Sequence, residues 1–127
     1  MNKNQTERDA LLEPYFGQRE YSGGIRSFQG LPAGVLQTLL DRDFAEYEDV
    51  QNEAPSLGEI LGFLHKHPTF VAHGYAVSAD RGDYRISIEG VNQIGLDELS
   101  KDELVSFTEM FRRADEFSLS PANAWFD

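Results

Sequence analysis

The sequence predicts an α+β fold in which about four principal helices pack on a small antiparallel sheet built around a β-hairpin at residues 70–94. Apolar and polar residues alternate from residue 84 to residue 89, which is typical of a half-buried strand. On both sides of the hairpin, apolar residues recur every three or four positions, as they do on one face of a helix. A chain of 127 residues with 40% hydrophobic content is expected to form one domain, with residues 1–5 frayed.

The N-terminal segment predicts one short helix followed by a loop. Thr6 is a suitable N-cap for a helix over residues 7–13, which is expected to end at Pro14. Four glycines between residues 15 and 30 then interrupt any helical period. Within this loop, residues 25–28 are expected to add a brief extended segment.

The next helix is predicted from Pro32 to about residue 48. Proline suits the first turn of a helix because its missing amide would have no partner there. The apolar residues share one face at three- to four-residue spacing: Val35, Leu36, Leu39, Leu40, Phe44 and Tyr47. The acidic residues fall largely on the opposite face: Asp41, Asp43, Glu46 and Glu48.

Two capping boxes predict where the remaining helices begin. In the first, the Ser56 hydroxyl accepts from the Glu59 amide while the Glu59 carboxylate accepts from the Ser56 amide, and the helix is expected to end before Pro68. Ser100 and Glu103 form the same motif at the start of another helix. The buried face of that helix is expected to comprise Leu104, Phe107, Phe111 and Ala114. Residues 120–126 are expected to form one last turn.

The alternate residues of the first strand form two sets, and only one set can face the helices. We call this choice the parity of the hairpin, and the two parities bury different side chains. A two-residue loop at 81–82 sets Val77 opposite Ile86, and a loop at 82–83 keeps the same parity. We favour this parity because bulky apolar groups then meet on the core side. A three-residue loop at 80–82 swaps the faces, because an odd shift reverses the side on which every side chain lies. It sets three small residues opposite the isoleucines: Ala72, Gly74 and Ala76.

The parity also decides the role of His73. With the favoured loop, His73 and Tyr75 face the helices, and His73 is a core residue. With the three-residue loop, His73 and Tyr75 join Arg85 and Glu89 on the outer face of the sheet as a polar and aromatic patch. That patch would be the first surface to test for binding.

The composition indicates a soluble cytoplasmic protein that avoids polyanions. There is no cysteine, no apolar N-terminal leader and no run long enough to cross a bilayer. The formal charge is −11, from 22 acidic and 11 basic side chains. Residues 31–60 carry seven of the acids against Arg42 alone. Such a field repels phosphate backbones and anionic lipids, so we expect neither nucleic acid nor membrane as a partner.

Few residues suggest chemistry. His65, His67 and His73 are the only possible metal cluster, but the first two are spaced to point in different directions and the third lies on a strand. Ser56 and Ser100 are explained by helix capping. We therefore expect no metal, no cofactor and no catalytic residue, and we lean against an enzyme. A small hydrolase-like enzyme with a carboxylate and histidine site remains the first alternative.

A winged-helix regulator is the second alternative, because two helices precede the hairpin in the order of that fold. A helix that reads DNA should offer Arg, Lys, Asn or Gln to base edges. Here the second helix offers only Lys66 and the histidines at its end, so DNA binding is disfavoured.

The leading hypothesis is a non-enzymatic protein–protein interaction or inhibitory/immunity-type module that binds a basic protein partner or forms a homodimer. Two features support an interaction surface: an acidic segment, and apolar residues at the C-terminal end of the chain. The candidate surface residues are Asp41, Asp43, Glu46, Glu48, Asp49, Trp125 and Phe126. A lone hairpin also has two unpaired edges, which either the segment at 25–28 or a second subunit should cover.

Overall fold

The fold is α+β, as predicted. The computed structural model describes residues 1–18, 20–50, 54–94, 99–114, 116–119 and 122–126. In these residues, four α-helices accompany a five-stranded antiparallel sheet of strand order β1-β2-β3-β5-β4. The elements in chain order are α1 (Gln5–Leu12), the 3₁₀ turn η1 (Glu13–Tyr15), β1 (Ile25–Leu31), α2 (Ala33–Asp41), α3 (Leu57–Lys66), β2 (Phe70–Val77), β3 (Arg85–Gln93), α4 (Lys101–Phe111), β4 (Glu116–Leu119) and β5 (Ala122–Trp125).

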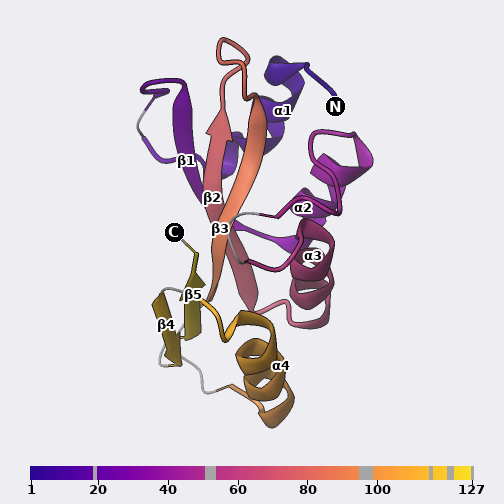
Figure 1. Cartoon of the computed structure of the whole chain (residues 1–127), viewed down its shortest axis with the longest axis vertical. Coiled ribbons are helices and arrows are strands. Elements are labelled where there is room, and N and C mark those ends of the chain that lie inside the picture. The colour runs from indigo at the N-terminus through magenta and orange to yellow at the C-terminus, as the bar shows by residue number, and fades with distance from the viewer. Residues whose placement is uncertain (19, 51–53, 95–98, 115, 120–121, 127) are drawn as a thin grey trace.

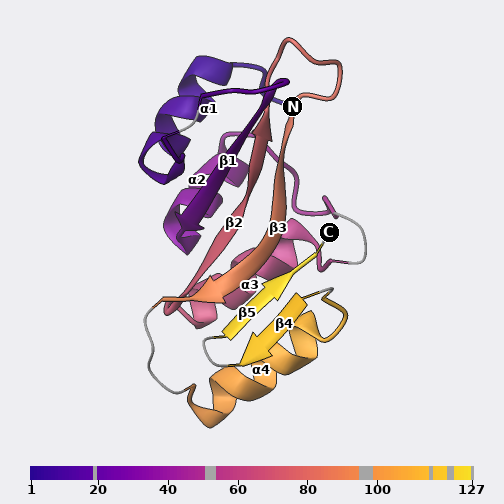
Figure 2. The same ribbon diagram turned by 90° about the vertical axis from the view of Figure 1, so that its left-hand side faces the viewer.

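The molecule has a helical layer on one side of the sheet. Helices α2, α3 and α4 lie to the right of the strands in Figure 1, and α1 lies at the upper end. Figure 2 looks onto the opposite face, where the strands stand in front of the helices. We call this opposite side the outer face of the sheet.

Both capping boxes are confirmed, and so is the extended segment near residue 25. The Ser56 hydroxyl accepts from the Glu59 amide at 3.2 Å, and Ser100 and Glu103 repeat the arrangement at 3.1 Å. The first helix begins two residues earlier than predicted, because the side chain of Asn4 rather than Thr6 caps it.

Helix α2 ends at Asp41, so the predicted extension to residue 48 is wrong. Asp43 adopts a left-handed backbone with φ of 63°, which reverses the chain. The Phe44 amide then donates to the Leu39 carbonyl and the Asp43 amide to the Leu40 carbonyl, as in a Schellman motif. Leu39 and Phe44 are both fully buried, so the reversal returns an apolar side chain to the core.

The C-terminal segment is a β-hairpin, and the predicted last turn is wrong over residues 122–125; residues 120–121 lie outside the described part. Strand β5 pairs with β3 at Gly90, Val91 and Asn92, while β1 pairs with the other side of β2. Both edges of the central hairpin are therefore paired within one chain along these segments.

The favoured parity of the central hairpin is wrong. The chain leaves β2 after Val77 and enters β3 at Arg85, so the connection spans residues 78–84 and is longer than either predicted loop. Ala76 lies opposite Ile86 and Gly74 opposite Ile88, which is the parity of the three-residue alternative. A bulge between residues 73 and 74 then shifts the register.

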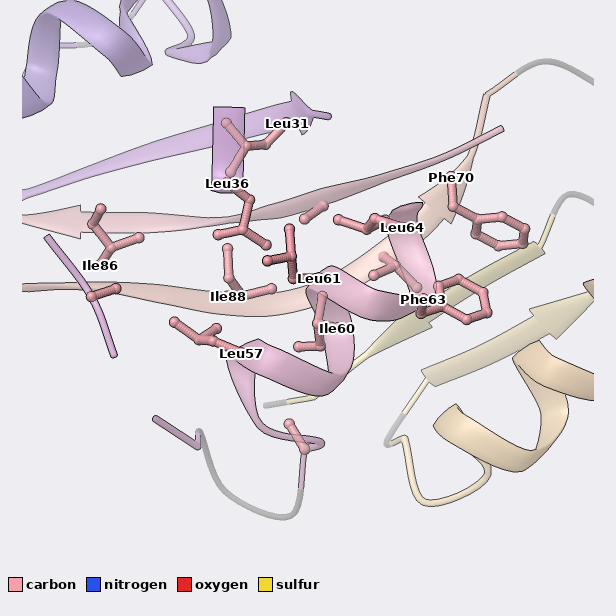
Figure 3. Close-up of a cluster of buried hydrophobic side chains, with 14 of the residues drawn as sticks. Leu31, Leu36, Leu57, Ile60, Leu61, Phe63, Leu64, Phe70, Ile86 and Ile88 are labelled. Carbon is pink, nitrogen blue, oxygen red and sulfur yellow. The ribbon is translucent and has the colours of Figure 1, made fainter. Parts of the chain in front are cut away.

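The inner face of the sheet and helix α3 form one layer of the core. Between residues 72 and 76 the inner residues of β2 are small, whereas α3 contributes large ones, and Ile88 and Leu61 point into the same space in Figure 3. Five residues of α3 are buried: Leu57, Ile60, Leu61, Phe63 and Leu64.

A cluster of phenylalanines joins α4 and the C-terminal strand to the rest of the core. The Phe63 ring lies 4.9 Å from Phe70 and 5.1 Å from Phe111, centroid to centroid. Phe107 stacks on Phe70 at 5.3 Å, and Phe126 meets Phe111 at 6.3 Å. Phe107 and Phe111 are thus buried as predicted. Their predicted neighbour Leu104 is 40% exposed, which corrects that part of the prediction.

A buried arginine attaches α1 to the loop end of the hairpin. Arg8 has no exposed surface, and its Nη1 donates to the carbonyls of Val77 at 3.0 Å and Arg85 at 3.3 Å. Its Nε pairs with Asp9 at 3.0 Å and its Nη2 donates to the Tyr21 hydroxyl at 2.8 Å. Burial, together with the hydrogen bond that Tyr21 donates to Asp9, raises the pKa of Tyr21 to about 12. The guanidinium therefore has a partner on every nitrogen, which a buried charge requires.

Replacing Arg8 should cost far more stability than replacing an exposed arginine. We expect Arg8→Met to lower the free energy of unfolding by about 3–5 kcal/mol, because it leaves two strand carbonyls and Asp9 without their donor. The control is Arg42→Met, whose side chain is 48% exposed and pairs with Glu7, and which should cost less than about 1 kcal/mol. Urea denaturation of both variants decides the point, and equal midpoints would contradict a structural role for Arg8.

Gly90 and Gly62 provide opposite tests of the backbone. A Cβ at Gly90 would overlap the Ala124 carbonyl oxygen, so Gly90→Ala should separate β5 from β3 and destabilise the protein by about 1–3 kcal/mol. Gly62 lies on the exposed side of α3 with nothing near its Cβ position, so Gly62→Ala should stabilise by about 0.5–1 kcal/mol. The measurement is the urea midpoint together with the fluorescence of Trp125, the single tryptophan. The β3–β5 pairing would be wrong if Gly90→Ala matched the parent in both.

Candidate functional site

The outer face of the sheet carries two rows of side chains across the strands. Residues that pair directly between neighbouring strands point to the same face. Ser27, Tyr75 and Ser87 form one row, and the next comprises His73, Gly90 and Trp125. These rows lie on β1, β2, β3 and β5, and in β2 their residues alternate with Ala72 and Ala76, which belong to the core. They therefore belong to the outer face, and that face of the strands is toward the viewer in Figure 2.

Gly90 brings the two rings of its row into contact. It lies between His73 and Trp125 and has no side chain, and their ring centroids are 4.8 Å apart. A Cβ at Gly90 would come within 2.9 Å of His73 Cε1. The contact therefore depends on glycine at the middle strand.

Arg85 connects the upper row to the loop that joins β2 and β3. Its Nη2 donates to the Tyr75 hydroxyl at 3.1 Å, and its guanidinium carbon lies 5.6 Å from the centre of the Tyr75 ring. Its Nη1 pairs with Asp83 at 2.7 Å and its Nε donates to Ser87 at 3.0 Å. The hydrogen bond from Arg85 holds the pKa of Asp83 below its usual value. These contacts keep Arg85 in one position above the strands.

Burial controls the charge of His73. Desolvation lowers the pKa of His73 below 6.5, although a hydrogen bond with Asn123 acts in the opposite direction. The imidazole is therefore neutral at pH 7, and it presents an aromatic surface beside Trp125 rather than a cation. A hollow of about 370 Å³ lies next to this pair, lined also by the amides of Asn92, Gln93 and Asn123.

We define the outer-face patch as His73, Tyr75, Arg85 and Trp125. Three of these residues belong to the polar and aromatic patch that the alternative parity predicts, and Trp125 was a candidate interaction residue on other grounds. The sequence alone did not bring Trp125 to this patch, because the pairing of β5 with β3 was not predicted. The alternation of buried Ala122, Ala124 and Phe126 with Asn123 and Trp125 is the signal that could have revealed that strand.

The acidic candidates lie at the end of α2 and in the chain that follows, and one of them, Asp49, lines a hollow of about 790 Å³ together with Tyr75 and Arg85. Four of them are exposed: Asp41, Asp43, Glu46 and Glu48. Asp49 is half-buried and accepts a hydrogen bond from the Glu46 amide at 3.0 Å. Phe126 is 2% exposed and packs in the core, so we leave it out of any free surface.

The histidines have separate environments. His65 contacts Gln37 at 3.1 Å, His67 packs on Phe63, and His73 packs on Trp125. Within the described ranges, no group of three or more His, Cys, Asp or Glu residues is arranged to hold a metal ion.

Comparison with protein-family models, with curated proteins and with solved structures found no match. In the described part of the chain, no helix has the length and apolar character needed to span a bilayer.

The lowered pKa of His73 predicts a pH dependence of stability. The unfolded chain binds a proton at this residue below about pH 6.5, whereas the folded chain does so only at lower pH. Because the unfolded state then binds more protons, the free energy of unfolding falls as the pH drops through this window. His73→Gln removes that contribution. We expect the parent to lose more stability than the variant between about pH 7.5 and pH 5.5 in urea titrations, and parallel curves would contradict it.

Proposed function

We propose that this protein is a non-enzymatic interaction module that binds a protein partner through the outer-face patch. One observation carries the proposal: the side of the sheet that faces away from α2, α3 and α4 gathers Tyr75, Arg85, His73 and Trp125 in two contacting pairs. Tyrosine, tryptophan and arginine are the residues most enriched among those that dominate binding energy at protein interfaces.

The order of these side chains favours binding without a large entropy cost. Tyr75 and Arg85 restrain each other, Asp83 and Ser87 restrain Arg85, and His73 restrains Trp125. Side chains that are already fixed lose less conformational freedom when a partner arrives. Strands also hold their side chains more rigidly than loops do.

The charge of the chain favours a basic partner. A formal charge of −11 attracts cationic proteins over a distance of about 10 Å at ordinary ionic strength and repels polyanions. Asp41, Asp43, Glu46 and Glu48 are exposed and add local negative charge at the α2 end. Inhibition of a basic protein, as in an immunity-type pair, is the form of binding that we propose.

The other functions have less support. In a winged helix the second helix must be presented to DNA, whereas α3 buries five residues beneath the sheet, and its exposed side carries Glu59. The argument for a homodimer is weaker, because β1 and β5 pair with the edges of the central hairpin that a second subunit was expected to cover. A second copy bound at the outer face is one outcome of the same experiment.

Site-specific photocrosslinking tests the proposal. A benzophenone amino acid replaces Tyr75 on the patch, Tyr47 beside the acidic residues, or Leu104 on α4; the last two are 45% and 40% exposed. In cells that naturally contain the protein, we expect a discrete adduct with a basic protein from position 75 and none from position 104.

Each other result is decisive. An adduct of twice the chain mass from position 75 would assign the patch to a homodimer, which sedimentation at micromolar concentration must then match. An adduct from position 47 alone would move the interaction to the acidic segment and refute the patch. Equal adducts from all three positions, or none from position 75, would refute the proposal.

A further inference from the structure

A second surface lies on the helical side, between α3 and α4. The two helices follow one another down the same side of the sheet in Figure 1. Between them is a hollow of about 560 Å³, which is within the range of pockets that hold small molecules. Residues from the whole length of α3 and from the second half of α4 line it.

Three cations line this hollow without an acidic partner among the residues that the structure describes. They are Lys66 at the end of α3 and Arg112 and Arg113 just after α4. The other arginines of the described ranges all form ion pairs: Arg8, Arg26, Arg42, Arg81 and Arg85. No acid whose side chain the structure describes forms an ion pair with Lys66, Arg112 or Arg113. In a chain with twice as many acids as bases, such a local excess of positive charge is unusual.

The two acids of the hollow do not cancel this charge. The Glu59 carboxylate accepts from the Ser56 amide at 3.1 Å in the capping box. Glu109 lies one turn before Arg113, but it forms none of the ion pairs found among the described side chains. Three cations against two carboxylates leave a net positive lining.

His67 adds a polar group that lacks a partner. It lines the same hollow, is 5% exposed, and packs against Phe63 with ring centroids 5.0 Å apart. Its Nε2 is buried and makes no hydrogen bond. Buried polar atoms are nearly always paired, so an atom left unpaired beside a hollow indicates a place for a ligand atom.

Apart from Ser106, the rest of the described lining is apolar, and it defines the body of the ligand. Phe63 and Met110 line the hollow from the two helices, together with Ala54 and Pro55. A bare inorganic ion would leave this surface unused. From the cations, the unpaired imidazole nitrogen and the apolar lining together, we infer that the hollow between α3 and α4 binds a small organic anion: a carboxylate or sulfonate on an apolar or aromatic body.

The test is a fluorescence titration of the full chain with 8-anilinonaphthalene-1-sulfonate, an aromatic sulfonate. We expect saturable binding of one molecule per chain, displaced by decanoate but not by the same concentration of inorganic phosphate. Failure to saturate at one site, or displacement by phosphate as effective as by decanoate, would overturn the inference. Because no protein partner takes part, the result is independent of the proposed function.

A matched pair of variants locates the site. Arg112→Gln/Arg113→Gln removes two charges from the hollow and should weaken binding of the probe about tenfold or more, because charge-assisted hydrogen bonds are lost. The control, Arg42→Gln/Lys101→Gln, removes the same charge from residues that do not line the hollow and should change the affinity less than about twofold. Circular dichroism in the near ultraviolet verifies that both variants are folded. Equal affinities for the two double variants would place the probe elsewhere and overturn the inference.

Discussion

A single buried guanidinium holds the N-terminal helix on the loop end of the central hairpin, and the outer face of the sheet depends on that attachment. Arg8 donates to the carbonyls of the last residue of β2 and the first residue of β3, so it holds the two strands where the loop leaves them. Arg85 is one of those residues, and its side chain donates a hydrogen bond to the Tyr75 hydroxyl. In a chain rich in acids, the partner of this buried cation is adjacent in sequence, at Asp9, which limits the desolvation cost of bringing both charges inside.

The parity of the hairpin shows why buried apolar area is a poor guide to strand orientation. Counting large side chains favours turning Tyr75 and Val77 inward. However, α3 already fills the space below β2 with large residues, including Leu61 and Leu64, and a core must be filled to a nearly constant density. The strand beneath a bulky helix therefore contributes Ala72 and Ala76, both with no exposed surface. His73 and Tyr75 are left to the outer face.

The parts of the fold that the sequence predicts well are those decided within one turn of helix. The capping boxes join residues three positions apart, so the residue types alone reveal them. The end of α2 was missed because Asp43, rather than glycine, takes the left-handed position, and a periodic apolar residue at Phe44 looks like further helix. The C-terminal strand was missed because it is stabilised by pairing with β3, some thirty residues earlier in the chain. The same limit applies to the candidate site. His73 and Tyr75 could be proposed from the hairpin alone, whereas their proximity to Trp125 depends on the pairing of β5 with β3.

The two candidate surfaces use different physical interactions and lie on opposite sides of the sheet. The outer-face patch offers ordered aromatic area, while the hollow between α3 and α4 offers unpaired positive charge above an apolar lining. They are nevertheless connected through the phenylalanine cluster. Phe63 lines the hollow and meets Phe111 at 5.1 Å, and Phe111 meets Phe126, the residue after Trp125. Two ring contacts therefore join the lining of the hollow to the residue that follows Trp125.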